Sequence, residues 1–188
     1  PSFAKIVFLM GNHEEVLLRI LAGETDILPD WLRFGGSECA RSYGVDPVDL
    51  ECREPAAALR LLRRAIPKEH IKFLAGFAHT ASFGRYLFVH AGIRPGVPLD
   101  RQEGKDLRWI RGPFLEDESD HGSIVVHGHT ITEEVDERQN RIGLDTGAYW
   151  SGVLTAVGLE ADERWYLQTP SASPAESGTV RVANFSEA

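Results

Sequence analysis

Residues 6–21 decide the fold, and they read Ile6-Val7-Phe8-Leu9-Met10, then Gly11-Asn12-His13-Glu14, then Glu15-Val16-Leu17-Leu18-Arg19-Ile20-Leu21. Five consecutive apolar residues that end at a glycine predict a strand buried on both faces. The apolar residues after the turn recur at helical spacing and share one face, and two glutamates open the helix. The stretch therefore predicts a strand, a sharp turn and an amphipathic helix.

The turn between that strand and that helix carries an amide, an imidazole and a carboxylate, on Asn12, His13 and Glu14. It lies at the carboxyl end of the predicted strand, which is the edge where open α/β sheets bind ligands. The side-chain oxygen of Asn12 suits a cation. The alternative is that Asn12 only caps the helix and that His13 is an ordinary, partly exposed histidine.

Two later histidine clusters favour the ligand-binding interpretation. Each directly follows an apolar run that ends in valine, and they read Val89-His90-Ala91-Gly92 and Val125-Val126-His127-Gly128-His129-Thr130. Strand ends on one edge of a sheet converge in space. We therefore expect the three clusters to form one site.

The three clusters occur in the order found in the phosphoprotein-phosphatase branch of the calcineurin-like metallophosphoesterases, which the chain resembles from about Phe3 to Thr169. The match is closest to bacterial serine/threonine-phosphatase-like and diadenosine-tetraphosphatase-like members. This resemblance implies an α/β fold with four layers (α/β/β/α), in which helices flank a β-sandwich. The family's upstream motifs, Asp-x-His and Asp-x-x-Asp-Arg, do not occur in this sequence, so we expect a truncated domain that lacks its N-terminal strands.

The resemblance also implies a metal site and a general acid. It makes Asn12, His90 and His129 ligands of one of the family's two divalent metals, with Mn first and Fe, Zn or Ni as alternatives. His127 competes for the ligand role, because residues i and i+2 of a strand share a face. The family's ligand stands between Gly and Thr, which selects His129. His13 would protonate the leaving alkoxide.

Three further side chains are expected to bind the substrate. Arg111 resembles the family arginine whose guanidinium binds two phosphate oxygens, and Arg94 is the weaker candidate. For both, the alternative is an ordinary surface arginine. Tyr149 belongs to Asp145-Thr146-Gly147-Ala148-Tyr149, a segment that matches the part closing the family's site. We treat Asp145 as structural, and we expect Trp31 and Phe34 to be core anchors.

Composition limits the class of protein and its partners. The 188 residues are 43% hydrophobic and 26% charged, which fits one globular domain. The formal net charge is −8 and no basic run exceeds Arg63-Arg64, so nucleic acid and anionic membranes are poor choices of partner. Cys39 and Cys52 lack zinc spacing and predict free thiols in a reducing, cytoplasmic setting, although one disulfide between them stays open.

The remaining pattern predicts the order of elements. Helices begin at Pro55 and near Lys68, and a hairpin spans Thr80 to His90. Strands at 123–126 and 141–144 and a closing hairpin over 153–168 complete a domain of residues 1–169, whose second sheet is antiparallel. Residues 170–188 form a Pro/Ser-rich, flexible tail in which 180–185 could add an edge strand.

These features predict a metal-dependent phosphoesterase that hydrolyses phosphomonoesters with metal-activated water. Its substrate would be a phosphorylated protein or a small phosphoester or nucleotide. Two alternatives stay open. One is a diadenosine polyphosphate hydrolase, and the other is an inactive phosphate- or metal-binding module, because both aspartate motifs are missing.

Overall fold

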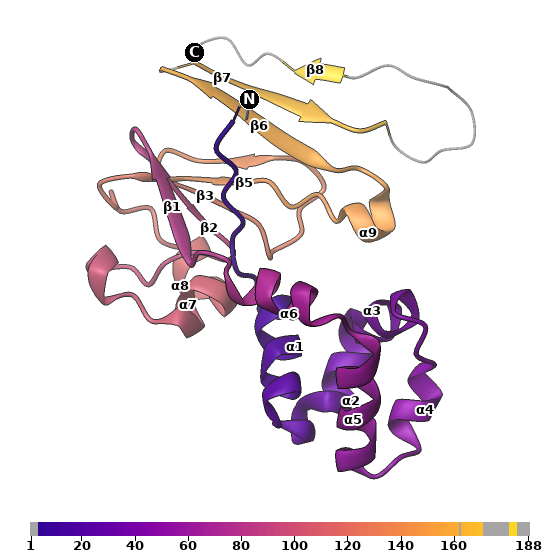
Figure 1. The fold of residues 1–188 in the computed structure, drawn as a ribbon. Helices are drawn as coiled ribbons and strands as arrows, with labels where there is room; N and C mark the ends of the chain where they lie inside the picture. Colours follow the sequence, from indigo (N-terminus) through magenta and orange to yellow (C-terminus); the bar gives the residue numbers. More distant parts are fainter. Residues whose placement is uncertain (1–3, 162, 171–180, 184–188) are drawn as a thin grey trace. The chain divides into compact units, whose positions relative to one another are not determined.

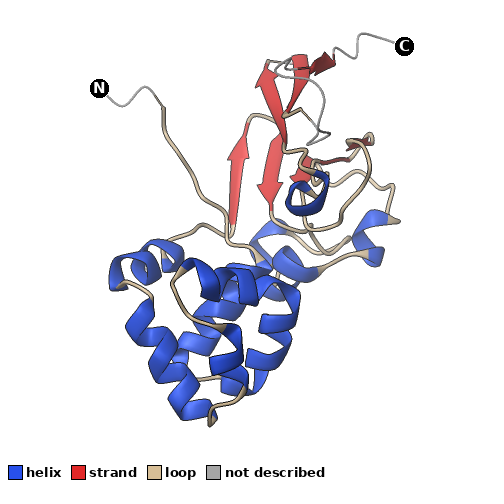
Figure 2. Cartoon of the chain, turned by 90° about the vertical axis from the view of Figure 1, so that its right-hand side faces the viewer, coloured by secondary structure: helices blue, strands red, loops and turns tan. Residues whose placement is uncertain are grey.

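The computed structural model describes residues 4–161, 163–170 and 181–183, and the chain divides into two compact units, Pro1–Ala78 and His79–Ala188 (Figure 1). We call them unit 1 and unit 2 and describe each by itself. Unit 1 is built from helices, whereas unit 2 holds the sheets (Figure 2). The protein is therefore a mixed α/β chain, as predicted. The prediction of one domain over residues 1–169 stays a prediction.

The helices of unit 1 follow one another with short connections. They are α1 (Asn12–Ala22), a 3₁₀ turn (Thr25–Ile27), α2 (Leu28–Trp31), a π-helical turn (Leu32–Gly36), α3 (Ser37–Ser42), α4 (Pro47–Glu51), α5 (Pro55–Ala65) and α6 (Lys68–Ala75). The helix predicted after Gly11 is confirmed, and the Gly11 N–H donates to the Glu14 carboxylate at 3.0 Å, which caps its first turn. Pro55 opens α5 as predicted, because its missing N–H is not needed there.

The core of unit 1 forms where the apolar face of α1 meets α2 and α5. Its fully buried members include Ile20 from α1 and Leu62 from α5. Trp31 is 5% exposed and is a core anchor as predicted, whereas Phe34 is 64% exposed, so that prediction is wrong for Phe34. The chain kinks at Phe34 and Gly35, where the backbone leaves helical φ/ψ, and this turns the phenyl ring away from the core.

The predicted strand over Ile6 to Met10 is not buried on both faces. Ile6, Val7 and Phe8 are 71%, 47% and 46% exposed, and in the described chain the segment makes one parallel bridge, between Leu9 and Ala78. A strand is buried on both faces only where neighbouring strands and packed layers cover it. Here the Phe8 ring instead contacts the rings of Phe73 and Phe77, at centroid distances of 4.9 and 5.2 Å.

Unit 2 contains a five-stranded sheet of order β1-β2-β3-β5-β4, with β2, β3 and β5 parallel and the two outer strands antiparallel. Its strands are β1 (Thr80–Phe83), β2 (Tyr86–Val89), β3 (Ile124–His127), β4 (Asp136–Glu137) and β5 (Arg141–Gly143). A second, antiparallel sheet holds β6 (Thr155–Glu160), β7 (Glu163–Gln168) and β8 (Arg181–Ala183). Both predicted hairpins and the antiparallel second sheet are confirmed. The predicted flexible tail lies mostly in residues 171–180 and 184–188, outside the described residues.

Strand alternation sorts the side chains of the five-stranded sheet into two cores. On one face Leu87, Val89 and Val125 pack against the short helices α7 (Gly104–Trp109) and α8 (Gly112–Leu115), where Phe114 is fully buried. On the other face Ile124, Val126 and Ile142 pack against Tyr166 of β7. Unit 2 therefore has three layers, with helices on one face and the second sheet on the other. A 3₁₀ turn (Leu99–Arg101) and α9 (Ala148–Ser151) complete it.

Among the described residues, no helix combines the length and the apolar character needed to cross a membrane.

Candidate functional site

The carboxyl ends of the three parallel strands of unit 2 carry the predicted histidines. His90 directly follows β2, His127 ends β3, and Leu144 follows β5. The Gly128 N–H donates to the His90 carbonyl at 2.9 Å, and the Leu144 N–H donates to the His127 carbonyl at 2.8 Å. These hydrogen bonds hold the three strand ends side by side, so the convergence that the sequence predicted is confirmed for the two clusters that lie in unit 2.

The imidazoles of His90 and His129 lie next to each other, with ring centroids 5.1 Å apart and planes inclined by 55°. A metal about 2.1 Å from a nitrogen of each ring would hold the centroids at most roughly 6.5 Å apart. The distance between the centroids is therefore within the range that one shared ion allows. His129 has a φ of 64°, an uncommon value for a residue other than glycine, and such backbone strain clusters at functional sites.

The donor set around these two histidines is small. Among the described residues, no group of three or more His, Cys, Asp or Glu side chains is arranged to hold a metal. An ion shared by His90 and His129 would need donors of another kind, such as an amide oxygen or water.

Arg111 lies beside the loop that carries His129. Its Nη1 donates to the His129 carbonyl and to Thr130 Oγ1, both at 3.0 Å. The Trp109 ring stands edge-on to the His129 ring at a centroid distance of 6.1 Å. The structure thus brings together His90, His129 and Arg111, three of the residues singled out in the sequence.

Arg94 is already engaged by a carboxylate. Its Nε and Nη2 donate to the two oxygens of Asp106 at 2.7 and 2.6 Å, and Asp106 is 7% exposed. This two-point hydrogen bond between the Arg94 guanidinium and the Asp106 carboxylate anchors the loop after His90 to α7. The predicted contact between Arg94 and substrate stays a prediction.

Tyr149 lies on α9 and is 85% exposed. The turn before that helix is closed by Asp145, whose carboxylate accepts from the Gly147 N–H at 3.0 Å. A Cβ on Gly147 would lie 2.9 Å from Ile131 and 3.6 Å from the Trp150 indole nitrogen, so α9 packs directly against the loop that follows His129.

In unit 1, Asn12 is the first residue of α1 and is 8% exposed, whereas His13 is exposed. The His13 ring lies against the kink at Gly35, where a Cβ would come within 3.5 Å of its Cε1. Asn12 does not cap the helix, because Gly11 occupies that position. The predicted roles of Asn12 as ligand and His13 as acid stay predictions.

His127 has a different environment from its neighbour His129. It is 4% exposed, its Nδ1 lies 3.1 Å from the Gly128 carbonyl, and its ring stands edge-on to Phe114 at 5.1 Å. Burial lowers the pKa of His127, against the opposing effect of the hydrogen bond to Gly128. Because a carbonyl oxygen can only accept, His127 Nδ1–H donates to it and fixes the peptide next to His129.

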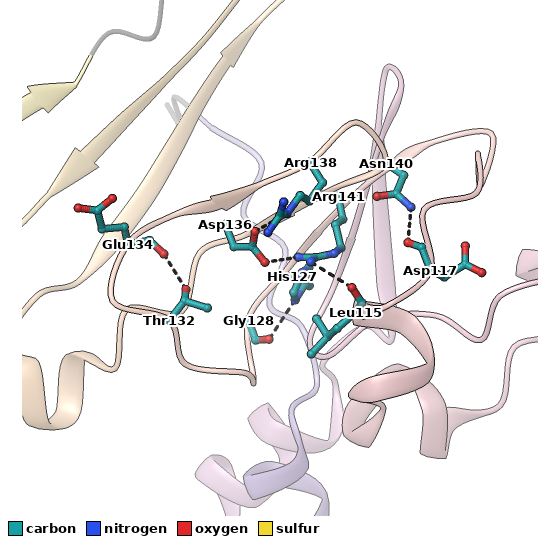
Figure 3. Close-up of polar contacts among 10 residues, drawn as sticks. All are labelled: Leu115, Asp117, His127, Gly128, Thr132, Glu134, Asp136, Arg138, Asn140 and Arg141. Atoms are coloured by element: carbon teal, nitrogen blue, oxygen red, sulfur yellow. Dashed lines mark hydrogen bonds and ion pairs between the residues drawn. The ribbon is translucent and has the colours of Figure 1, made fainter.

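An ion-pair group at β4 and β5 was not found from the sequence (Figure 3). Arg141 is 5% exposed, and its Nη1 donates to Asp136 at 2.6 Å while its Nη2 donates to the Leu115 carbonyl at 3.2 Å. Arg138 donates to the other Asp136 oxygen at 2.8 Å. Burial pushes the pKa of Asp136 upward, but the hydrogen bonds and charges of Arg141 and Arg138 outweigh it and lower that pKa. No motif or spacing in the sequence marks this group.

Comparison with known proteins gives a likeness of fold. The sequence matches no protein-family model and no curated protein. Its structure is similar to the crystal structure of a protein provisionally assigned as a diadenosine tetraphosphatase, with a TM-score of 0.51 and 16% sequence identity. The similarity covers 95% of this chain and 68% of that chain. At this level of identity the likeness concerns the fold alone.

Proposed function

We propose that this protein is a metal-dependent phosphoesterase, in which His90 and His129 bind a divalent transition metal and Arg111 binds phosphate. The observation that carries the proposal is the pair of imidazoles 5.1 Å apart at the carboxyl edge of the parallel strands, with Arg111 bonded to the same loop. The similar crystal structure supports a phosphoesterase-like α/β fold. We further propose that the complete fold is the four-layer metallophosphoesterase sandwich.

Each residue of the proposed site has a chemical task. A bound divalent metal would lower the pKa of a bound water and polarise a phosphate. Arg111 carries five N–H donors, so the two hydrogen bonds of its Nη1 leave donors for phosphate oxygens while they fix the guanidinium plane. His127 holds the peptide before His129 in place through the Gly128 carbonyl.

Asn12 and His13 come to the proposal from the sequence pattern alone. We assign Asn12 the role of a third, oxygen ligand and His13 the role of general acid. Mn is the metal we propose first, because the family resemblance implies it, and Fe, Zn or Ni are the alternatives, because these ions suit imidazole donors.

A second candidate substrate class is the diadenosine polyphosphates. Tyr149 and Trp150 are 85% and 71% exposed on α9, which packs against the loop that carries His129. Exposed aromatic rings at this position offer stacking surfaces for nucleobases, which phosphoserine or phosphothreonine peptides do not need.

The test measures hydrolysis by the full-length protein with Mn²⁺, using p-nitrophenyl phosphate, a phosphoserine peptide and diadenosine tetraphosphate as substrates. His13→Asn should lower kcat by roughly 10²–10⁴-fold, because it removes the proton donor for the leaving group. His70→Asn is the matched control, since His70 is also exposed on unit 1 and should leave kcat unchanged. Equal turnover in the His13→Asn protein and the native protein would contradict the mechanism.

A further inference from the structure

The opposite edge of the same sheet carries a second polar site. The amino ends of β2, β3 and β5 lie there, and a shallow pocket is lined by Arg85, Ile124, Glu137, Arg138, Gln139 and Arg164. Arg85 directly precedes β2 and Ile124 opens β3, whereas His127 closes β3 at its other end. Four strand residues span about 13 Å, so this pocket, which we call the amino-edge pocket, is separate from the sheet edge that carries His90 and His129, which we call the histidine edge.

Both carboxylates of this region, Asp136 and Glu137, already have a partner at each oxygen. Asp136 accepts from Arg138 with one oxygen and from Arg141 with the other. Glu137 is paired with Arg164 at 2.7 Å through Oε1 and accepts from the Tyr166 hydroxyl through Oε2. Each oxygen of both carboxylates therefore already has a partner within unit 2.

The pocket therefore has an excess of positive charge. Three arginines line it, Arg85, Arg138 and Arg164, together with one carboxylate, Glu137, which leaves two formal positive charges in a protein whose net charge is −8. An anion bound between these groups relieves their repulsion. The two carboxylates hold their arginines in place in advance, so little side-chain ordering is left for the ligand to impose.

The guanidiniums are presented in different ways. Arg164 is 26% exposed and is fixed by Glu137, whose position is held in turn by the Tyr166 hydroxyl. Arg138 is 65% exposed and is fixed by Asp136, and Arg85 is exposed on the tight turn after Gly84. A guanidinium binds two phosphoryl oxygens with a pair of parallel N–H donors. Because it has five N–H donors, an arginine that is paired with one carboxylate still has donors for a phosphoryl group.

We infer that the amino-edge pocket binds a diphosphate group, because two adjacent phosphoryl groups can each meet a guanidinium within this spread of three arginines and their negative charge offsets the excess positive charge. The group can come from inorganic pyrophosphate or from a nucleoside diphosphate, which share this chemistry. The site is distinct from the histidine edge and does not depend on a metal there.

The test follows the backbone amide resonances of the full-length, ¹⁵N-labelled protein during titration with pyrophosphate in metal-free buffer. We expect saturable shifts at Arg85, Arg138 and Gln139. Gln139→Glu places a negative charge among the residues that line the pocket and should weaken binding of pyrophosphate by roughly tenfold. Gln139→Met, which keeps the length without a charge, should bind as the native protein does.

Further variants and a second ligand test whether the diphosphate binds in this pocket. Arg138→Ala should weaken binding, whereas Arg41→Ala should not, although Arg41 is similarly exposed (61%) and similarly paired with a carboxylate. Arg111→Ala should leave the affinity unchanged, so the proposed phosphoesterase activity can fail without affecting this result. A parallel titration with ADP identifies a nucleotide source if its affinity exceeds that of pyrophosphate. Shifts confined to Arg111 and residues 128–130, or equal affinities in the Gln139→Glu and Gln139→Met proteins, would overturn the inference.

Discussion

Gly92 shows how one residue holds the histidine edge in shape. It lies two positions after His90 with a φ of 153°, and a Cβ there would lie 2.3 Å from Cδ1 of Phe114. Phe114 is fully buried and also contacts the ring of His127. The close approach of the backbone to Phe114 therefore requires glycine.

Gly92→Ala should accordingly lower the free energy of unfolding by about 2–3 kcal/mol, because neither the backbone nor the phenyl ring can move without disturbing the core. Gly96→Ala is the control. It has a φ of 74° but open space around the added Cβ, so it should cost only about 1 kcal/mol of backbone strain. Denaturant-induced unfolding measures both, and equal losses would show that the contact with Phe114 does not matter.

At the same scale, strand ends and a motif order marked His90, His129 and Arg111, which the structure places close together, while their roles stay predictions. It could not predict the partners of Arg94 or Arg141. The pairing of Arg94 with Asp106 depends on how a loop returns to α7, and the pairing of Arg141 with Asp136 depends on side-chain direction in a turn. Neither leaves a periodic pattern along the chain.

At the scale of elements, local signals succeeded and burial signals did not. Short strand-like runs on either side of a turn predicted both hairpins of unit 2, and Pro55 predicted the start of α5. The burial predicted for the apolar run over Ile6 to Met10 was wrong. Apolar character indicates that a segment is stabilised by burial, but it does not indicate whether neighbouring strands are present to bury it. Likewise Phe73, an apolar residue of α6, is 51% exposed and contacts Phe8 and Phe77.

The pairing of β4 with β5 depends on Asp136, and this gives a pH-dependent prediction. The folded-state pKa of Asp136 is below its unfolded value of about 3.9, so the ionised carboxylate stabilises the fold above that pH and the stabilisation is lost as the pH falls through the folded pKa. Asp136→Asn should lower the free energy of unfolding by about 3 kcal/mol near neutral pH, because it leaves the buried Arg141 without its counter-charge.

The measurement compares unfolding of the native and Asp136→Asn proteins between about pH 6 and pH 3. The difference between them should shrink as the pH falls, since protonation removes the same charge from the native protein. Asp100→Asn, an exposed aspartate of unit 2, should show no such difference at any pH. A constant gap across the range would contradict the assigned role of Asp136.

At the scale of the whole molecule, the chain consists of a helical unit and a unit of two sheets, each with its own core. Composition predicted a globular protein of ordinary hydrophobicity, but length alone did not reveal the division at Ala78. The division also separates the residues of the predicted site, because Asn12 and His13 belong to unit 1 and the other candidates belong to unit 2. The order of motifs along the sequence stays the same whether or not the chain divides into units, so it could not reveal this division.

The central claim is that His90 and His129 bind a metal, and Mn²⁺ binding to the full-length protein, followed by the electron paramagnetic resonance of the free ion, tests it most directly. The native protein should bind Mn²⁺ at this site, and His90→Ala and His129→Ala should each weaken that binding by roughly tenfold or more. His79→Ala is the control, because His79 is an exposed histidine of unit 2 and its loss should leave the affinity unchanged. If the His129→Ala protein binds Mn²⁺ as tightly as the native and His79→Ala proteins, the assignment of the metal site is wrong.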